Sequence, residues 1–318
     1  MLPLPATRHD YESSSLVKWL LPIALALTVA GGRAETLAAG LTIAQSPAPE
    51  VVTNWHPTWS PDGEWIAYSS NRDGGPDIWK TDGVHVRRIV RGGTEPDWSP
   101  DGKRIAFSGL KGGIYLVPAA GGTPRRITAA AGREPSWSPD GRTIAYTDPE
   151  GAWGSGISMI RADGKRRRVL LSASTEWEEY FSPAWSPDGA QLATVFSDFG
   201  QYDIVFATIR GGATRSSSSS GSRAGRPSWS PDGRFIVYSN DESSSGSYDG
   251  GGYGTMFVTD VRSGRTRSLT RVQGNGPAWS PGGKRIAFAG QKREGGSEIY
   301  LASPDGSHLV QLTKTPPR

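Results

Sequence analysis

The sequence contains no cysteine and only four histidines among its 318 residues. Without cysteine there is no disulfide, no thiol nucleophile and no cysteine to carry a lipid. A domain of this size can bury enough core without disulfides, so their absence does not argue against export. Gly-x-Ser-x-Gly, His-Glu-x-x-His and phosphate-cradling motifs are also missing. Catalysis therefore has little support, and we expect a protein that is not an enzyme.

Long apolar runs are equally scarce, with one exception near the start. Residues 16–30 are apolar apart from Lys18 and Thr28, and a small-residue segment ending at Ala34 follows. This pattern is typical of a secretory signal peptide, and the run is shorter than the ~20 residues that a spanning helix needs. We expect residues 1–34 to be a signal peptide, or alternatively an uncleaved membrane anchor at 16–30, and residues 35–52 to be a linker. The protein is then exported to the periplasm, the cell envelope or the outside.

Glycine (42 residues) and proline (24 residues) are abundant and recur at fixed places. The motif Trp-Ser-Pro-Asp-Gly begins at residues 59, 98, 137, 185 and 229, and a sixth copy at 279 has Gly282 in place of Asp. Proline pre-sets φ, Asp suits the next position, and Gly adopts the positive φ that closes a tight turn. A period of roughly 40–50 residues indicates an array of supersecondary units.

Short β-favouring runs surround each turn. Pro-x-Trp precedes it, and because proline cannot donate to a ladder, this strand is expected at a sheet edge. Three further runs follow, as at residues 66–68, 77–79 and 88–90. Four short antiparallel strands, repeated six times, predict an all-β fold, a six-bladed β-propeller over residues 53–318. The last repeat supplies its own fourth strand, so we expect the ring to close by packing between blades.

The repeat resembles the TolB-type, WD-like propeller repeat. The shared pattern is Pro-x-Trp-Ser-Pro-Asp-Gly, then Ile-Ala-Tyr/Phe, Asp-Ile-Tyr/Trp, Asp-Gly and Arg-Arg-Ile. It covers about Thr53 to Thr315 and departs at Gly282 and in enlarged loops of repeats three to five. The resemblance concerns the propeller part only, and we expect the separate α/β domain that precedes the propeller in TolB to be absent. It implies a protein-interaction module whose partner is an envelope or secreted protein or peptide.

The variable loops identify the expected binding face. In a propeller, the second-to-third strand loops and the blade-to-blade connections share one face, here called the loop face. The Ser-Pro-Asp-Gly turns lie on the other, here called the turn face. Function usually lies on loops held by a rigid scaffold. The candidate binding residues there are Glu176, Trp177, Glu178 and Tyr180, since carboxylates beside aromatics could grip a basic or sugar-like partner. Alternatively, Trp177 packs beneath the loop and the acids are solvated.

The central channel, which the innermost strands should line, is the second candidate site. His56, Glu95, Asp97 and Glu134 flank the repeated prolines of three adjacent blades, and Arg226 has the equivalent place in the fifth repeat. Glu95, Glu134 and Arg226 are candidate binding residues. His56, Glu95, Asp97 and Glu134 could instead hold a divalent cation, although the alternative is an acidic, hydrated funnel without a fixed ligand. No other cofactor is expected.

The net charge is +4, and much of the arginine and lysine falls in the fourth strands. Such a rim could contact membrane headgroups or anionic cell-wall polymers, or it could simply protect exposed strand edges from pairing. Nucleic acid is not an expected partner, because no nucleic-acid fold signature is present. We expect a monomer. The alternatives to an interaction module are a propeller enzyme acting on carbohydrate, as a lyase or hydrolase, and a structural domain without a tight ligand.

Overall fold

The computed structural model describes residues 51–129, 131–151, 153–210, 214–216, 223–241, 253–269, 273–292 and 295–316. Contacts divide the chain into Met1–Ser46 and Pro47–Arg318, and every described residue belongs to the second part. The predicted signal peptide or anchor, and the linker up to residue 50, lie outside the described residues. No helix occurs among the described residues, so none there is long and apolar enough to cross a bilayer.

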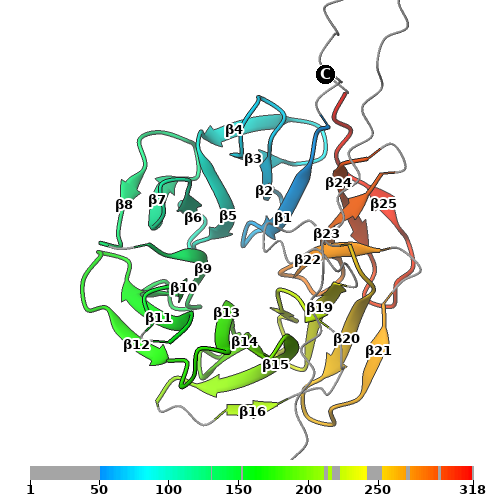
Figure 1. The fold of residues 1–318 in the computed structure, drawn as a ribbon. Helices are drawn as coiled ribbons and strands as arrows, with labels where there is room; N and C mark the ends of the chain where they lie inside the picture. The colour runs from blue at the N-terminus through cyan, green and yellow to red at the C-terminus, as the bar shows by residue number, and fades with distance from the viewer. Residues whose placement is uncertain are drawn as a thin grey trace, which may run out of the picture. The chain divides into compact units, whose positions relative to one another are not determined.

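The strands form six antiparallel blades in a ring, as predicted (Figure 1). Blade 1 consists of β1 (Asn54–Trp59), β2 (Ile66–Ser70), β3 (Asp77–Thr81) and β4 (Val86–Val90). Blade 2 consists of β5 (Gly93–Trp98), β6 (Arg104–Gly109), β7 (Ile114–Pro118) and β8 (Arg125–Arg126). Blade 3 consists of β9 (Arg133–Trp137), β10 (Thr143–Asp148), β11 (Gly156–Arg161) and β12 (Arg168–Leu171).

The other three blades repeat this plan. Blade 4 consists of β13 (Glu178–Trp185), β14 (Gln191–Asp198), β15 (Gln201–Thr208) and β16 (Thr214–Ser216). Blade 5 consists of β17 (Arg223–Ala224), β18 (Ser228–Trp229), β19 (Phe235–Asp241), β20 (Met256–Asp260) and β21 (Thr266–Ser268). Blade 6 consists of β22 (Gly274–Trp279), β23 (Ile286–Gln291), β24 (Ser297–Ala302) and β25 (Val310–Gln311). Blade 5 differs because its innermost strand is split into β17 and β18, which both pair with β19.

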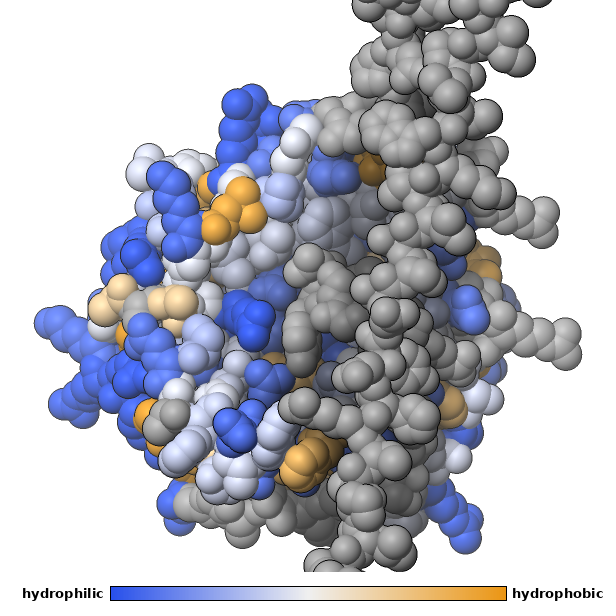
Figure 2. Space-filling model, in the orientation of Figure 1, coloured by the Kyte–Doolittle hydropathy of each residue, from blue (hydrophilic) through white to orange (hydrophobic). Residues whose placement is uncertain are grey.

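The core lies between neighbouring blades. Every residue of β2 is buried, because adjacent blades cover both faces of the strand. The first interface joins Ile78 of blade 1 to Trp98, Ile105 and Phe107 of blade 2. The continuous apolar runs in the sequence thus reflect burial on both faces. At the periphery, hydrophilic side chains project over the outer strands β8 and β12 (Figure 2).

The Ser-Pro-Asp-Gly turn is held by its own side chains. In the first copy, Ser60 Oγ donates to Asp62 Oδ1 and accepts from Trp65 N at 2.8 Å. Gly63 has a φ of 75°, and its N–H donates to Ser60 O. In the sixth copy, Arg285 N still donates to Ser280 Oγ at 3.0 Å. The substitution at Gly282 therefore removes the carboxylate contact and leaves the turn intact.

Among the described residues, every sheet contains only strands that are consecutive in the sequence, so no strand is exchanged between the first and last blades there. A dense polar network joins blades 1 and 6 instead. Asn54 Nδ2 donates to Glu298 Oε2 and to Thr315 Oγ1, and Asn54 N donates to Ser297 Oγ. Thr53 adds an isolated parallel bridge to Ser297.

Candidate functional site

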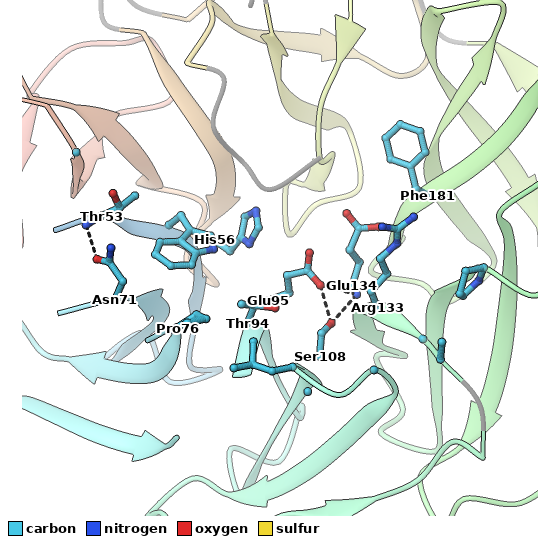
Figure 3. Close-up of a pocket in the computed structure, with 18 of the residues that line it drawn as sticks. Thr53, His56, Asn71, Pro76, Thr94, Glu95, Ser108, Arg133, Glu134 and Phe181 are labelled. Carbon is cyan, nitrogen blue, oxygen red and sulfur yellow. Dashed lines mark hydrogen bonds between the residues drawn. The ribbon is translucent and has the colours of Figure 1, made fainter. Parts of the chain in front are cut away.

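A pocket of about 970 Å³ opens on the loop face at the centre of the ring. Its rim comes from second-to-third strand loops and blade-to-blade connections, for example Leu110 and Pro149. Trp55, Phe181 and Tyr253 supply apolar wall. Figure 3 shows His56, Glu95 and Glu134 reaching in from neighbouring strands. The structure thus brings three of the predicted channel residues together in one cavity.

An unusual backbone conformation precedes the repeated prolines of the innermost strands. The residue before proline has a positive φ in five blades, at His56, Glu95, Glu134, Ser182 and Gly276, with values from 52° to 58°. The pairing register shifts at the same places, as between Thr94 and Asp97. Left-handed backbone in non-glycine residues costs of order 1–3 kcal/mol and persists only where the surroundings enforce it. Each such bulge re-aims a side chain.

Hydrogen bonds between blades hold these strained residues in place. Glu95 Oε2 accepts from Glu134 N at 2.9 Å, and Glu134 Oε2 accepts from Ser182 N at 2.9 Å. Ser182 Oγ also donates to Glu134 Oε1 at 2.7 Å. The two glutamates therefore form a chain of hydrogen bonds, here called the relay, in which each carboxylate accepts from a backbone N–H of the next blade. No proton transfer is implied. Their first role is therefore to stabilise the fold, a role that was not predicted from the sequence.

Hydroxyl groups of the second strands complete the relay. Ser69 Oγ accepts from Glu95 N at 3.0 Å, and Ser108 Oγ accepts from Glu134 N at 2.9 Å. Thr147 Oγ1 accepts from Ser182 N at 3.0 Å. Each hydroxyl residue directly follows the buried aromatic of its Ile-Ala-Tyr/Phe run. That spacing is the sequence signal that could have identified these partners.

Asp97 occupies a different cavity from Glu95 and Glu134. A second cavity of about 270 Å³ opens on the turn face and is lined by the Pro-x-Trp segments of all six blades. Asp97 Oδ2 accepts from Trp137 N at 2.7 Å, and Oδ1 accepts from Thr58 Oγ1 at 3.3 Å. His56 lines both cavities, so it lies between them.

Arg226 lines the turn-face cavity from the break between β17 and β18. Its Nη1 atom is buried and has no hydrogen-bond partner among the described residues. Its positive charge acts on His56, Glu95 and Asp97, which belong to blades 1 and 2. The guanidinium of blade 5 therefore acts electrostatically on titratable groups of two other blades.

Burial sets the protonation of the channel groups. Desolvation, and secondarily the charge of Arg226, lowers the pKa of His56 well below its usual value. Desolvation and the neighbouring Glu134 raise the pKa of Glu95. Desolvation raises the pKa of Asp97 to about 6, against the opposing hydrogen bond from Trp137 N. His56 is therefore neutral near pH 7, and the channel contains carboxylates that bind protons more readily than usual.

The predicted divalent-cation site stays a prediction. Across the part of the chain that the structure describes, no group of three or more His, Asp or Glu side chains has an arrangement that could hold a metal ion. Asp97 and the Glu95–Glu134 pair lie in different cavities, and hydrogen bonds already occupy oxygens of all three carboxylates.

Two of the predicted loop-face residues are exposed to solvent, and the other two contact neighbouring residues of the loop and strand. Glu176 and Trp177 are exposed, so Trp177 does not pack beneath its loop. Glu178 accepts hydrogen bonds from Ser174 N and Oγ, which lower its pKa and fix the loop. Tyr180 is half-buried, and its ring lies 4.9 Å from that of Phe196. Glu176 and Trp177 are therefore available to a partner, whereas Glu178 and Tyr180 shape the site.

Trp177 has an aromatic neighbour that was not predicted from the sequence. The rings of Trp177 and Phe199 stack with centroids 5.4 Å apart and planes inclined by 19°. Phe199 and Gly200 form the two-residue turn between β14 and β15. A two-residue hairpin of this kind usually contains Asn-Gly or Asp-Gly. An aromatic residue before glycine between two apolar runs was the available signal.

Comparison with known proteins identifies relatives of this propeller. The sequence profile of a family described as the TolB beta propeller domain matches residues 42–176 and 135–250. The Tol-Pal system protein TolB of Alcanivorax borkumensis is 34% identical over 82 residues, which are 26% of this chain and 18% of that protein. The chain thus matches less than a fifth of that relative's length.

Solved structures share the fold. The putative TolB from Agrobacterium tumefaciens has a TM-score of 0.63 at 24% identity, covering 74% of this chain and 88% of that one. TolB from Acinetobacter baumannii has a TM-score of 0.60 at 22% identity, covering 81% of this chain and 62% of that one. An oligogalacturonate lyase in complex with manganese has a TM-score of 0.53 at 14% identity, covering 79% and 90% respectively. At these identities the likeness concerns the fold alone.

Proposed function

Because the chain belongs to the TolB beta-propeller domain family, we propose that it is an exported, non-catalytic module that binds a protein or peptide segment in its loop-face pocket. The observation that carries this proposal is the pocket itself. Its volume of about 970 Å³ is at the upper end of ordinary ligand sites, and it combines apolar wall with a few convergent polar groups. Such a cavity suits an inserted peptide segment.

The rigidity of the pocket supports a binding role. The glutamates at its floor hold neighbouring blades together through Glu134 N and Ser182 N. A receptor whose polar groups are already fixed loses little conformational entropy when a partner binds. Holding the blades together requires no proton transfer from these carboxylates. Their structural role therefore favours a binding function over a catalytic one.

Membership of the family supports a proposal for the partner and the location. One matched relative is named as a protein of the Tol-Pal system, and we propose an envelope or secreted protein as the partner and the periplasm or cell envelope as the location. The arginine-rich outer strands, including the exposed Arg125 and Arg126, would tolerate contact with membrane headgroups or anionic polymers. We propose that the propeller acts as a monomer.

Site-specific photo-cross-linking tests the binding face. A benzophenone amino acid would replace Leu110, an exposed residue of the pocket rim, and Val84, an exposed residue of the turn face, as the matched control. After irradiation of intact cells, we expect a discrete protein adduct from position 110 and none from position 84. Adducts of equal yield at both positions, or none at position 110, would contradict the proposal.

A carbohydrate-active enzyme is the second candidate, and one observation favours it. Glu95 and Asp97 have raised pKa values, that of Asp97 about 6, beside the neutral His56. Carboxyl groups tuned in this way can act as general acids or bases. Incubation with acidic and neutral oligosaccharides, followed by assays for new reducing ends and unsaturated products, tests this function. Activity in the wild type that is lost in both Glu95→Gln and Asp97→Asn would establish the enzymatic function. The absence of both enzymatic activity and a photo-adduct at position 110 would indicate a structural domain.

A further inference from the structure

Exposed aromatic side chains gather in one sector of the loop face. Among the described residues, only Trp153, Trp177 and Phe199 are aromatic and more than half exposed, at 62%, 55% and 71%. They belong to the β10–β11 loop, the β12–β13 connection and the β14–β15 turn. Isolated exposed apolar residues are normal, but a group of large aromatics marks an interaction site. These three residues are called the aromatic platform below.

The three segments are held against one another. Tyr180 N donates to Ser155 O at 2.9 Å, and Glu178 pairs with Asp198 across β13 and β14. The space beside Gly154 is also closed, because a Cβ added there would lie 2.3 Å from Glu178 O. The Trp177–Phe199 stack joins the second segment to the third. The platform is therefore a built surface rather than a chance exposure of three side chains.

Phe199 is in an unfavourable position for an exposed aromatic residue. Its φ is 45°, and that of the following Gly200 is 77°, so both turn residues are left-handed. A turn of this type normally selects Asn-Gly or Asp-Gly, since bulkier residues meet steric strain at positive φ. Phe199 thus combines backbone strain with exposure of an apolar ring. Stability alone does not explain such a residue, whereas a binding role does.

The platform carries charge of one sign. Its three segments, residues 149–155, 172–178 and 198–202, contain Glu150, Glu176, Glu178 and Asp198 and no lysine or arginine. Glu150 and Glu176 are exposed. A cationic group above the rings would meet both the negative face of an aromatic system and nearby carboxylates.

We propose that the aromatic platform binds an arginine side chain from an extended segment of the partner protein. The planar guanidinium stacks on the Trp177–Phe199 pair while its N–H groups donate to Glu176 or Asp198. Arginine fits better than lysine, because its delocalised, weakly hydrated cation stacks on rings and binds carboxylates through a fork of donors. This inference rests on the proposed partner-binding function and adds the chemistry of the partner.

Arginine peptides and their neutral analogues test the inference. The probe is Ac-Gly-Arg-Gly-Arg-Gly-NH₂, and the control replaces both arginines by citrulline, which has nearly the same shape without the charge. Indole N–H resonances in NMR spectra report binding, with Trp177 assigned through Trp177→Phe. We expect the Trp177 resonance to shift and the arginine peptide to bind about tenfold more tightly, since stacking and pairing at an exposed site are each modest. Equal affinity of the two peptides would refute the proposal.

Variants separate binding from folding. Phe199→Asn installs the residue that this turn prefers, so we expect an equal or higher melting temperature together with about fivefold weaker binding of the arginine peptide. Glu176→Gln alters neither turn nor stack and should weaken only the arginine peptide. Val84→Ala, at an exposed position outside the pocket and the platform, is the control and should change nothing. Full binding by both Phe199→Asn and Glu176→Gln would overturn the proposal.

Two further outcomes also count against it. Tighter binding of N,N′-diacetylchitobiose than of the arginine peptide, with the same indole shifts, would identify the platform as a carbohydrate site. If the arginine and citrulline peptides bind equally while a photo-adduct still forms at position 110, the inference is refuted but the proposed partner binding in the pocket is not. If no photo-adduct forms at position 110 but the arginine peptide is still preferred, the proposed function is refuted instead.

Discussion

Asn54 of blade 1 and Glu298 of blade 6 are joined by a buried hydrogen bond, in which Asn54 Nδ2 donates to Glu298 Oε2 at 2.7 Å. Thr315 N also donates to Glu298 Oε1 at 2.8 Å. One carboxylate therefore binds both the start and the end of the described propeller. Because the described strands of blades 1 and 6 share no sheet, this contact joins the two blades where a shared strand would otherwise do so. Its loss should therefore weaken the closure of the whole ring.

We expect Asn54→Ala to lower the free energy of unfolding by about 1.5–3 kcal/mol, as for other hydrogen bonds to charged groups. Urea denaturation measures this change. Glu64→Gln, which alters an exposed carboxylate of the first turn, is the control and should lie within about 0.5 kcal/mol of the wild type. A loss in Asn54→Ala no larger than in the control would show that packing alone closes the ring.

The repeated tryptophans and Trp177 should respond oppositely to truncation. Trp98 and Trp137 are buried between blades, whereas Trp177 is exposed. We expect Trp98→Ala and Trp137→Ala to cost about 3–5 kcal/mol and Trp177→Ala less than about 0.5 kcal/mol. Thermal unfolding of the three variants checks this. A large loss in Trp177→Ala would mean that this ring supports the fold.

The relay through Glu134 predicts a stability role for a channel carboxylate. Glu134→Ala leaves Ser182 N with fewer acceptors at a strained residue, and we expect a loss of about 1–3 kcal/mol. Glu134→Gln keeps one acceptor oxygen and should lose less. Chemical denaturation of both variants measures the difference. Unchanged stability in Glu134→Ala would show that these hydrogen bonds do not stabilise the fold.

The turn aspartates should make the fold sensitive to acid. Hydrogen bonds, first of all from the preceding serine, lower the pKa of Asp62, Asp101, Asp140, Asp188 and Asp232. Because the folded-state pKa lies below the unfolded value, each group stabilises the fold above about pH 4 and loses this effect as the pH falls through its folded-state pKa.

Asp101→Asn tests this dependence. The variant should be less stable than the wild type near pH 7, and the difference should shrink as the pH falls from about 4 to 2. Denaturation curves at several pH values give the two profiles. A constant difference between them across this range would show that the carboxylate charge contributes nothing to the turn. The sixth turn, with Gly282, already forms without that charge.

The fold was predictable because its determinants are local and repeated. Five copies of Pro-x-Trp-Ser-Pro-Asp-Gly, and a sixth with Gly282 in place of Asp, specify a turn through hydroxyl bonds like that of Ser60 and an edge strand through proline. Alternation of turns and apolar runs then specifies four strands per blade. The split of the innermost strand around Arg226 was not visible, because the motif in that repeat is otherwise regular.

The site was predictable only in part. The sequence placed His56, Glu95 and Glu134 at the channel, and the structure places all three at one pocket. It did not separate Asp97 from them, because that separation depends on the left-handed bulge at Glu95. The partnership of Trp177 with Phe199 also escaped notice, since it joins segments that come together only through the pairing of β13 and β14.

The seam between blades 1 and 6 has a consequence for the order of the chain. Residues 53 and 54 contact residues 297 and 315, and every sheet is made of consecutive strands. A short peptide could therefore join the two sides of the seam, and a cut at any blade-to-blade connection would leave each sheet with all its strands. The propeller is thus suited to circular permutation, with new chain ends placed in turn beside each sector of the pocket.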